Sequence, residues 1–329
     1  MSARTITWKI ADMAVPAPIS HPARINFPVH PGFGRVKSRP VEFVNPFQKF
    51  ASEQARLLRR GEKLPLGCSQ KIRQRPGKWE DAAKALIFSP HPDDECIVGG
   101  LALRLGRESG WNIINVAVTL GSNKARQIAR LRELRNACAQ LGFGLIVPRN
   151  QGLEKITLES QKQNQAHWKM AVRSMAEILA VQRPRAIFIP HEHDGHPVHA
   201  GTHFLVQDAL KTLPAGFRCH VIETEFWGQM TDPNLLVELS VADVGDQVAA
   251  LVCHVGEVRR NPYHARLPAW LMDNVRRGAE LVGGQGAKAP NFAFGTIYRL
   301  REWSHGQLVR IPIKQKFWSS ALKAGEIFA

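Results

Sequence analysis

Residues 85–95 read ALIFSPHPDDE, a short apolar run followed by a polar cluster. Charged or turn-forming residues bound the run, which therefore predicts a buried strand. Beyond Glu95, the apolar residues Val98, Leu101 and Leu105 recur at helical spacing. The helix dipole favours an acidic residue in the first turn, and we expect Glu95 to serve this start. The polar cluster should thus lie on a strand-to-helix turn, where open α/β sheets bind their ligands.

The cluster places the imidazole of His91 beside the adjacent carboxylates of Asp93 and Asp94. Imidazole and carboxylate groups together suit a divalent ion such as zinc. Two neighbouring carboxylates also allow one to bind metal while the other transfers protons. An ordinary polar loop that supports a helix start is the alternative, because short motifs also arise by chance.

A second polar cluster, PHEHDGHPVH at residues 190–199, follows the apolar run at 186–189. Five of the thirteen histidines lie between His191 and His203. Packing and solubility do not account well for such a concentration. We therefore predict one metal site assembled from the ends of two strands.

Strand and helix patterns alternate through this part of the chain. Strands are predicted at 85–88, 113–118, 145–147 and 186–190, and helices at 123–141, 161–182 and 199–213. Such alternation predicts a mostly parallel sheet with right-handed crossovers, in a Rossmann-like three-layer α/β/α sandwich. No Gly-x-Gly-x-x-Gly follows the first strand, so dinucleotide binding is not supported.

Residues 1–80 contain nine prolines and one helical segment, at 46–62. We predict an extended, basic, Pro-rich N-terminal arm over 1–80. A single domain over 81–329 should follow, with C-terminal embellishments from about residue 218. In that last part we expect a strand at 238–241, a helix at 243–260 and a turn-rich segment at 259–270.

The net charge of +16 favours anionic partners, but the excess Lys and Arg are dispersed. A generally basic surface is the preferred interpretation, and we do not expect nucleic acid as a partner. Five cysteines without a Cys-x-x-Cys pair predict reduced thiols and a cytoplasmic location. No segment is long enough to span a bilayer, and the N-terminus lacks the apolar core of a signal peptide. The arm is a candidate for the contacts that would hold subunits together in a homo-oligomer.

The order of motifs resembles the PIG-L/LmbE family of zinc-dependent deacetylases, which act on N-acetylglucosamine-type substrates. The shared motifs are PHPDDE at 90–95, TLGS at 119–122, RLREL at 130–134 and GHPVH at 195–199. The resemblance covers residues 84–203 well and continues weakly to about residue 300. It implies an amide hydrolase that removes an acetyl group from an N-acetylated amino sugar or its conjugate.

The resemblance also implies roles for single residues. His91, Asp94 and His199 match the three ligands of a catalytic zinc, or of another divalent metal. Asp93 matches the general base, and His196 matches the histidine that stabilises the oxyanion. Arg130 matches an arginine that reaches the substrate, although an i,i+3 surface ion pair with the glutamate of RLREL is nearly as plausible.

Several assignments stay open. Spacing alone leaves His191 and His193 as alternatives to His199 as ligand, while His203 is expected to pack behind it. The family often has an acidic residue where this chain has Val198, so His196 needs another partner, Asp194 or Glu225. The family often has a further sequence pattern near the C-terminal helix, and in this chain only His254 matches it. Supporting positions behind the ligands are predicted for Asp194, His193 and His254.

A catalytically idle metal- or sugar-binding module, whose basic arm docks nucleic acid or a protein, is the alternative from another functional class. The presence of Asp93 speaks against it, because a purely structural metal site does not need a second carboxylate.

Overall fold

The computed structural model describes residues 45–68 and 81–329. It divides into two units with a boundary between residues 48 and 49. The boundary falls in the first turn of helix α1 (Pro46–Gly61), so every other described element belongs to the second unit. Helix α1 confirms the helix expected at 46–62. Residues 1–44 and 69–80 of the predicted arm lie outside the described residues.

The described strands form one sheet in the order β3-β2-β1-β4-β5-β7-β6-β9, and β8 pairs with β7. Strands β1 to β5 run parallel, whereas β7 is antiparallel to β5 and β6. The predicted mostly parallel sheet is thus confirmed. The strands are β1 (Lys84–Ser89), β2 (Asn112–Ala117), β3 (Gly144–Ile146), β4 (Ala186–Pro190), β5 (Cys219–Thr224), β6 (Leu235–Leu239), β7 (Phe294–Ser304), β8 (Gln307–Arg310) and β9 (Phe317–Trp318).

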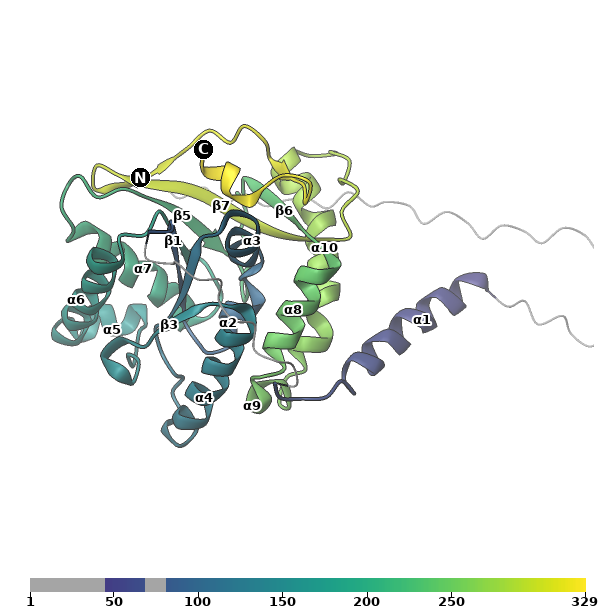
Figure 1. Ribbon diagram of the computed structural model, residues 1–329, viewed down its shortest axis with the longest axis horizontal. Helices are drawn as coiled ribbons and strands as arrows, with labels where there is room; N and C mark the ends of the chain where they lie inside the picture. The colour runs from purple at the N-terminus through teal and green to yellow at the C-terminus, as the bar shows by residue number, and fades with distance from the viewer. Residues whose placement is uncertain (1–44, 69–80) are drawn as a thin grey trace, which may run out of the picture. The chain divides into compact units, whose positions relative to one another are not determined.

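Helices cover both faces of this sheet, and Figure 1 shows α5, α6 and α7 on one side of β1 with α8 and α10 on the other. Alternate residues of β1 enter different cores: Ala85 and Ile87 join one cluster and Leu86 the other. The three-layer α/β/α sandwich is confirmed. Its helices are α2 (Asp94–Ile97), α3 (Gly100–Ser109), α4 (Lys124–Leu141), α5 (Leu158–Gln163), α6 (Gln165–Gln182), α7 (Pro197–Lys211), α8 (Val241–Leu251), α9 (Val255–Val258) and α10 (Tyr263–Gly283), with 3-10 turns η1 (Pro148–Asn150) and η2 (Ala324–Phe328).

The strand order reverses between β1 and β4. From β1 the chain adds β2 and then β3 on one side, while β4 and β5 lie on the other. Ala85 pairs with Ala186 and Ile87 with Phe188, so the two strands end side by side. Open α/β sheets bind ligands in the crevice outside the carboxyl ends of strands at such a reversal. The turns that carry the two polar clusters therefore meet at this crevice.

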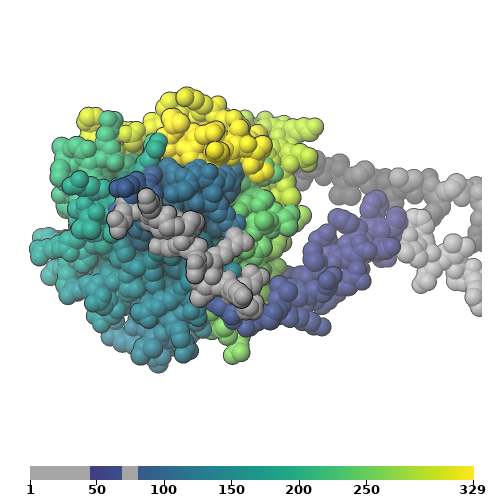
Figure 2. Space-filling model, in the orientation of Figure 1, coloured from purple at the N-terminus to yellow at the C-terminus, as the bar shows by residue number. Residues whose placement is uncertain are grey.

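The C-terminal residues extend this layer arrangement: Trp318, Ala324 and Phe328 join the larger core, and Met230, Leu236, Val282 and Ile297 form a small additional cluster. Figure 2 shows them, in yellow, against the blue segment that contains β1 and α3. The fully buried guanidinium of Arg104 on α3 donates hydrogen bonds to the carbonyls of Ser319 and Leu322. One buried cation thereby supplies hydrogen-bond donors to two backbone carbonyls of the C-terminal segment.

Several predicted boundaries were wrong. The helix expected at 161–182 is divided into α5 and α6, because Asn164 caps α6 by accepting a hydrogen bond from the backbone N–H of His167. The strand expected at 238–241 ends at Leu239, because Ser240 forms a capping box that starts α8. The helix expected at 243–260 is split into α8 and α9, and the turn-rich segment at 259–270 enters α10 despite Pro268.

Among the residues that the structure describes, no helix is long and apolar enough to cross a membrane.

Candidate metal and catalytic site

Side chains of the turn after β1 accept hydrogen bonds from the backbone of the same turn. The backbone N–H of His91 donates to Asp94 Oδ2 (2.8 Å), and that of Asp93 donates to Glu95 Oε2 (3.0 Å). Asp93 has φ 118°, a left-handed conformation that costs free energy for a residue other than glycine. Such strain persists only where the surroundings fix it, and here it lies between two predicted site residues. The expected role of Glu95 at the helix start is consistent with its hydrogen bond to Asp93.

The second turn ends where α7 begins. His196 is the N-cap of α7 and accepts the backbone N–H of Val198 on its Nδ1 atom (3.2 Å). His199 follows in the first turn and is buried. Gly201 brings α7 against another segment, since a Cβ atom there would lie 2.3 Å from the carbonyl oxygen of Ile156. Only glycine allows this approach without movement of the backbone.

Three donor atoms from the two turns converge. His91 Nδ1 lies 3.2 Å from His199 Nε2, and Asp94 Oδ2 lies 3.4 Å from His199 Nε2 and 3.7 Å from His91 Nδ1. Ligands about 2.0–2.2 Å from a tetrahedral zinc ion would be separated by about 3.3 Å. Asp94 Oδ1 is buried without a hydrogen-bond partner among the described residues, as expected of a carboxylate whose partner is not a protein group. This donor set therefore fits a divalent metal ion.

Asp194 orients His199 rather than His196. Its Oδ2 atom lies 3.2 Å from His199 Nδ1, on the side of the ring away from Asp94. A carboxylate behind a ligand histidine fixes the ring and its tautomer. Asp194 also caps its loop, because Oδ1 accepts the backbone N–H of Trp227 (3.2 Å). Glu225, the other expected partner of His196, instead binds Arg277.

The ring of His196 is held by the backbone. Because Nδ1 accepts the N–H of Val198, the hydrogen of the neutral ring lies on Nε2. His196 also has a ring nitrogen within 4.8 Å of those of His91 and His199. Burial and the nearby charges of His91 and His199 lower the pKa of His196, which favours a neutral hydrogen-bond donor.

The pKa values of the two adjacent carboxyl groups are driven apart. Burial and the charge of Asp94 raise the pKa of Asp93 well above its usual range, although the charge of Arg130 opposes this. Burial also opposes ionisation of Asp94, but the charges and hydrogen bonds of His199 and His91 outweigh it and lower the pKa of Asp94. Neighbouring carboxyls in such contrasting surroundings are suited to different roles.

The remaining residues that the sequence singled out differ in burial and in hydrogen-bond partners. His193 is exposed, whereas His191 is buried with its Nε2 atom 2.9 Å from the carbonyl oxygen of Gly228. The His191 ring thus already has a backbone partner. His203 is buried, and its Nδ1 donates to the carbonyl oxygen of Pro190 (2.9 Å), as expected of a packing residue. Arg130 lines a pocket over the two turns and donates to the carbonyl oxygen of Pro92 (3.1 Å).

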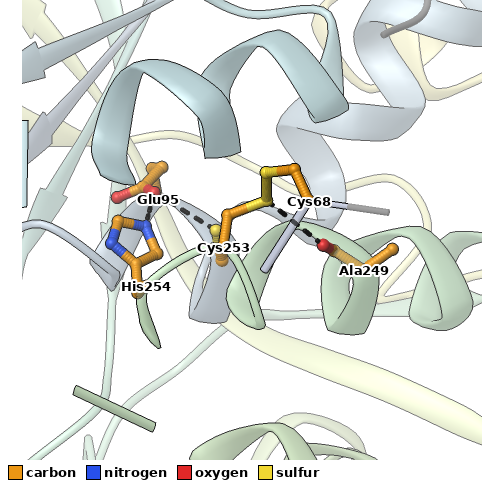
Figure 3. The surroundings of a disulfide bond; sticks show 6 residues. Cys68, Glu95, Ala249, Cys253 and His254 are labelled. Carbon is orange, nitrogen blue, oxygen red and sulfur yellow. Dashed lines mark hydrogen bonds and ion pairs between the residues drawn. A yellow bond between two sulfur atoms is a disulfide. The ribbon is translucent and has the colours of Figure 1, made fainter. Parts of the chain in front are cut away.

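His254 lies behind the β1 turn, away from the three donor atoms. Its Nε2 atom is 2.7 Å from Glu95 Oε1, and both side chains are fully buried (Figure 3). Glu95 in turn holds the backbone of Asp93, so a chain of hydrogen bonds runs from α9 to the strained residue. Cys96 is buried and donates to Glu95 Oε1.

The prediction that the cysteines are reduced thiols was wrong for two of them. Cys68 and Cys253 form a disulfide bond beside His254 (Figure 3). These residues are 185 positions apart, and no Cys-x-x-Cys spacing signals their proximity. Disulfide bonds are more usual in oxidising compartments, so the expected cytoplasmic location stays a prediction.

The pocket over the two turns has a volume of about 480 Å³. Sequence reasoning missed the part of its wall supplied by the chain after β5. Phe226 and Trp227 lie just beyond Glu225, the first residue after that strand, and aromatic residues near the carboxyl end of a parallel strand could have been recognised as candidates. The pocket is lined by these and other residues, among them His91, Asp93, Asp94, Ser122, Lys124, Arg126, Arg130, Lys155, His196, Phe226, Trp227, Glu257, Arg260 and Tyr263.

The chain is similar to several known proteins. Residues 86–210 match the family model described as PIG-L, GlcNAc-PI de-N-acetylase. The chain is 29% identical over 149 residues to a 1D-myo-inositol 2-acetamido-2-deoxy-alpha-D-glucopyranoside deacetylase of Thermomonospora curvata. The match covers 36% of this chain, and it spans half the length of that relative.

Two solved structures share the fold. A conserved protein of Thermus thermophilus superposes with a TM-score of 0.50 at 19% identity, over 65% of this chain and 93% of that one. A 4-carboxy-2-hydroxymuconate hydratase of Pseudomonas putida superposes with a TM-score of 0.50 at 18% identity, over 66% and 95%. At these identities the likeness concerns the fold alone.

Proposed function

Because residues 86–210 match the PIG-L family model, we propose that this protein is a metal-dependent, zinc-using amide hydrolase. The substrate is an N-acetylated amino sugar of the N-acetylglucosamine type, or a conjugate of it, and the products are acetate and a free amine. The observation that carries the proposal is the convergence of three donor atoms beside a buried carboxyl group with a raised pKa.

His91, Asp94 and His199 would hold the metal, which when bound lowers the pKa of water and polarises a carbonyl oxygen. Their donor atoms already have the separations of a tetrahedral set, and Asp194 fixes the ring of His199. Ligand groups that are preorganised in this way need little movement to bind.

Asp93 acts as the general base. Its carboxylate takes a proton from the water that attacks the amide carbon, and it later gives that proton to the nitrogen as the C–N bond breaks. A base that is poised near neutral pH performs both transfers best, and burial moves the pKa of Asp93 in that direction. Asp93 lines the pocket with its backbone in a left-handed conformation, whereas Asp94 Oδ2 faces His91 and His199.

His196 stabilises the charge that develops on the carbonyl oxygen. Its Nε2–H donates to this oxygen as the amide carbon becomes tetrahedral. The fixed hydrogen bond from the Val198 backbone to Nδ1 keeps that proton on the correct nitrogen, so the chain does not need an acidic residue at position 198.

The fold alone does not choose this reaction, since a hydratase has a similar one. The decisive experiment measures acetate and free amine from a panel of N-acetylated amino sugars, with zinc-loaded wild type and Asp93→Asn. We expect equal amounts of both products from wild type and about a 10²- to 10⁴-fold slower reaction with the variant. Zinc binding without faster turnover by wild type on every panel member would favour the idle binding module.

A further inference from the structure

The disulfide bond between Cys68 and Cys253 joins the segment that follows α1 to the short connection between α8 and α9. Residues 252–254 make this connection, and His254 is the N-cap of α9. Next to the disulfide, the backbone N–H of Gly67 donates to the carbonyl oxygen of Val252 (2.9 Å). The bridge therefore fixes the residue that directly precedes His254.

A continuous path of contacts leads from this bridge to the proposed base. His254 Nε2 lies 2.7 Å from Glu95 Oε1, and Glu95 Oε2 accepts the backbone N–H of Asp93 (3.0 Å). The side chains of Glu95 and His254 are fully buried, where a hydrogen bond is stronger than in water (Figure 3). Asp93 depends on such support, because its positive φ is unfavourable for a residue other than glycine. A displacement of His254 would thus reach the backbone of Asp93.

The two cysteines of the bridge differ in their surroundings. Cys68 is exposed, whereas Cys253 is only 2% exposed. Exposed disulfide bonds are open to attack by thiolates from solvent, and they are the labile, regulatory kind. The sulfur atom of Cys253 lies 3.6 Å from the carbonyl oxygen of Ala249, to which a free thiol can donate. The fold therefore offers the reduced form of Cys253 a hydrogen-bond partner.

A role in stability alone does not require this position. A cross-link stabilises mainly by constraining the unfolded chain, and this effect depends on the separation of 185 residues rather than on the neighbours of the bridge. Here the bridge adjoins a residue that contacts the active-site turn. In a reducing cytoplasm, the location expected from the cysteine pattern, disulfide bonds are usually transient and redox-sensing.

We propose that the Cys68–Cys253 bridge regulates the active site by its redox state: the oxidised form holds Asp93 in its working position, and reduction releases it through His254 and Glu95. The inference rests on the proposed function, because Asp93 is the base of that reaction. In the reduction, one thiolate of a dithiol attacks the Cys68 sulfur, and Cys253 leaves as a thiolate. The second thiol then frees Cys68 by closing the disulfide of the dithiol. Two electrons pass from the dithiol to the bridge, and two protons complete the freed cysteine thiols.

The first test measures activity with the panel substrate that wild type turns over fastest. We expect reduction by dithiothreitol to lower kcat about tenfold at an unchanged KM, as is typical when support behind an active-site group is lost. Oxidised dithiothreitol should restore kcat. Because free thiols bind zinc, the reagent is removed and zinc is restored before each assay. Circular dichroism shows whether both forms are folded.

Three variants separate the bridge from other effects of the reductant. Cys68→Ser should have the kcat of reduced wild type both before and after treatment. Cys219→Ala is the matched control, because Cys219 is buried at the start of β5 and does not line the pocket, and it should respond as wild type does. In His254→Asn, whose shorter side chain does not reach Glu95, reduction should change kcat by less than about twofold. A full loss on reduction of His254→Asn would overturn the proposed path.

Amide hydrogen exchange of metal-free wild type needs neither turnover nor a variant. We expect the exchange rate of the Asp93 N–H, relative to the rates in α6, to rise about tenfold on reduction, because a local opening adds to any global loss of stability. This result without turnover of any panel substrate would support the redox control and refute the deacetylase. Equal acceleration at Asp93 and in α6, or an equal kcat of the folded oxidised and reduced forms, would overturn the redox control and leave the deacetylase intact.

Discussion

The buried pair of Glu95 and His254 should be the most sensitive polar contact behind the active site. Replacing His254 with leucine keeps an apolar side chain of similar size but removes the 2.7 Å partner of Glu95 Oε1. Glu95 is fully buried, and its other oxygen holds the backbone of Asp93 in a left-handed conformation. The carboxyl group would be left with only the weak Cys96 thiol donor on Oε1.

The expected size of the effect follows from this burial. Breaking a buried pair by removing one partner costs about 3–5 kcal/mol, because the remaining group is left uncompensated. That is a large part of the roughly 5–15 kcal/mol by which domains are stable. The hydrogen bond itself should contribute about 1.5–3 kcal/mol of coupling, as is typical when one partner is charged.

Urea unfolding of wild type, His254→Leu, Glu95→Leu and the double variant measures both quantities. We expect His254→Leu to lose about 3–5 kcal/mol and the double variant to lose less than the sum of the two single losses. The reasoning is refuted if His254→Leu stays within about 1 kcal/mol of wild type, or if the single losses add within about 0.5 kcal/mol.

Further predictions concern Asp93 as the general base, the disulfide bond of Cys68 with Cys253, and the ion pair of Glu192 with Arg299. Asp93→Asn should lose activity but keep the urea midpoint of wild type. Burial already disfavours the charged form of Asp93, and asparagine tolerates a positive φ. A midpoint well below that of wild type would contradict this. Cys68→Ser should lose about 2–5 kcal/mol, because the bond links residues 185 apart, and dithiothreitol should lower wild type to the same midpoint without affecting the variant. Equal midpoints of the two proteins before reduction would show that the bond does not stabilise the fold. Burial opposes ionisation of Glu192, but its hydrogen bonds and the charge of Arg299 outweigh it and lower its pKa to about 2. A depressed carboxyl pKa stabilises the folded state above the unfolded value of 4.5, and this contribution disappears as the pH falls towards 2. The stability advantage of wild type over Glu192→Gln should therefore be full at pH 6 and vanish near pH 2, and an advantage that is constant with pH would contradict the assignment.

The fold could be predicted because its signals are local. The apolar runs before His91 and His191 are short, are bounded by turns and alternate with helical patterns, so the parallel sheet followed from periodicity. Element boundaries that are set by side-chain capping were harder to predict from the sequence. Asn164 and Ser240 begin helices through capping hydrogen bonds that no hydrophobic pattern reveals.

The candidate site could be predicted only in part for a similar reason. His91, Asp94 and His199 lie in two motifs at strand ends, and the sheet order brings them together. The separation of the roles of Asp194 and Glu225 depends on contacts with Trp227 and Arg277, which are distant in sequence. The pairing of Cys68 with Cys253, and of Glu257 with Arg126, depends on the same kind of distant contact.

The central claim is that two strand ends build one metal site. Anomalous diffraction at the zinc edge, from crystals of zinc-loaded protein, tests it most directly. We predict a single strong peak about 2.0–2.2 Å from His91 Nδ1, Asp94 Oδ2 and His199 Nε2. A main peak anywhere else would contradict it. Such a peak could lie at the cluster of Glu95, Cys96 and His254, at the cluster of Glu192, His203 and Glu223, or away from both.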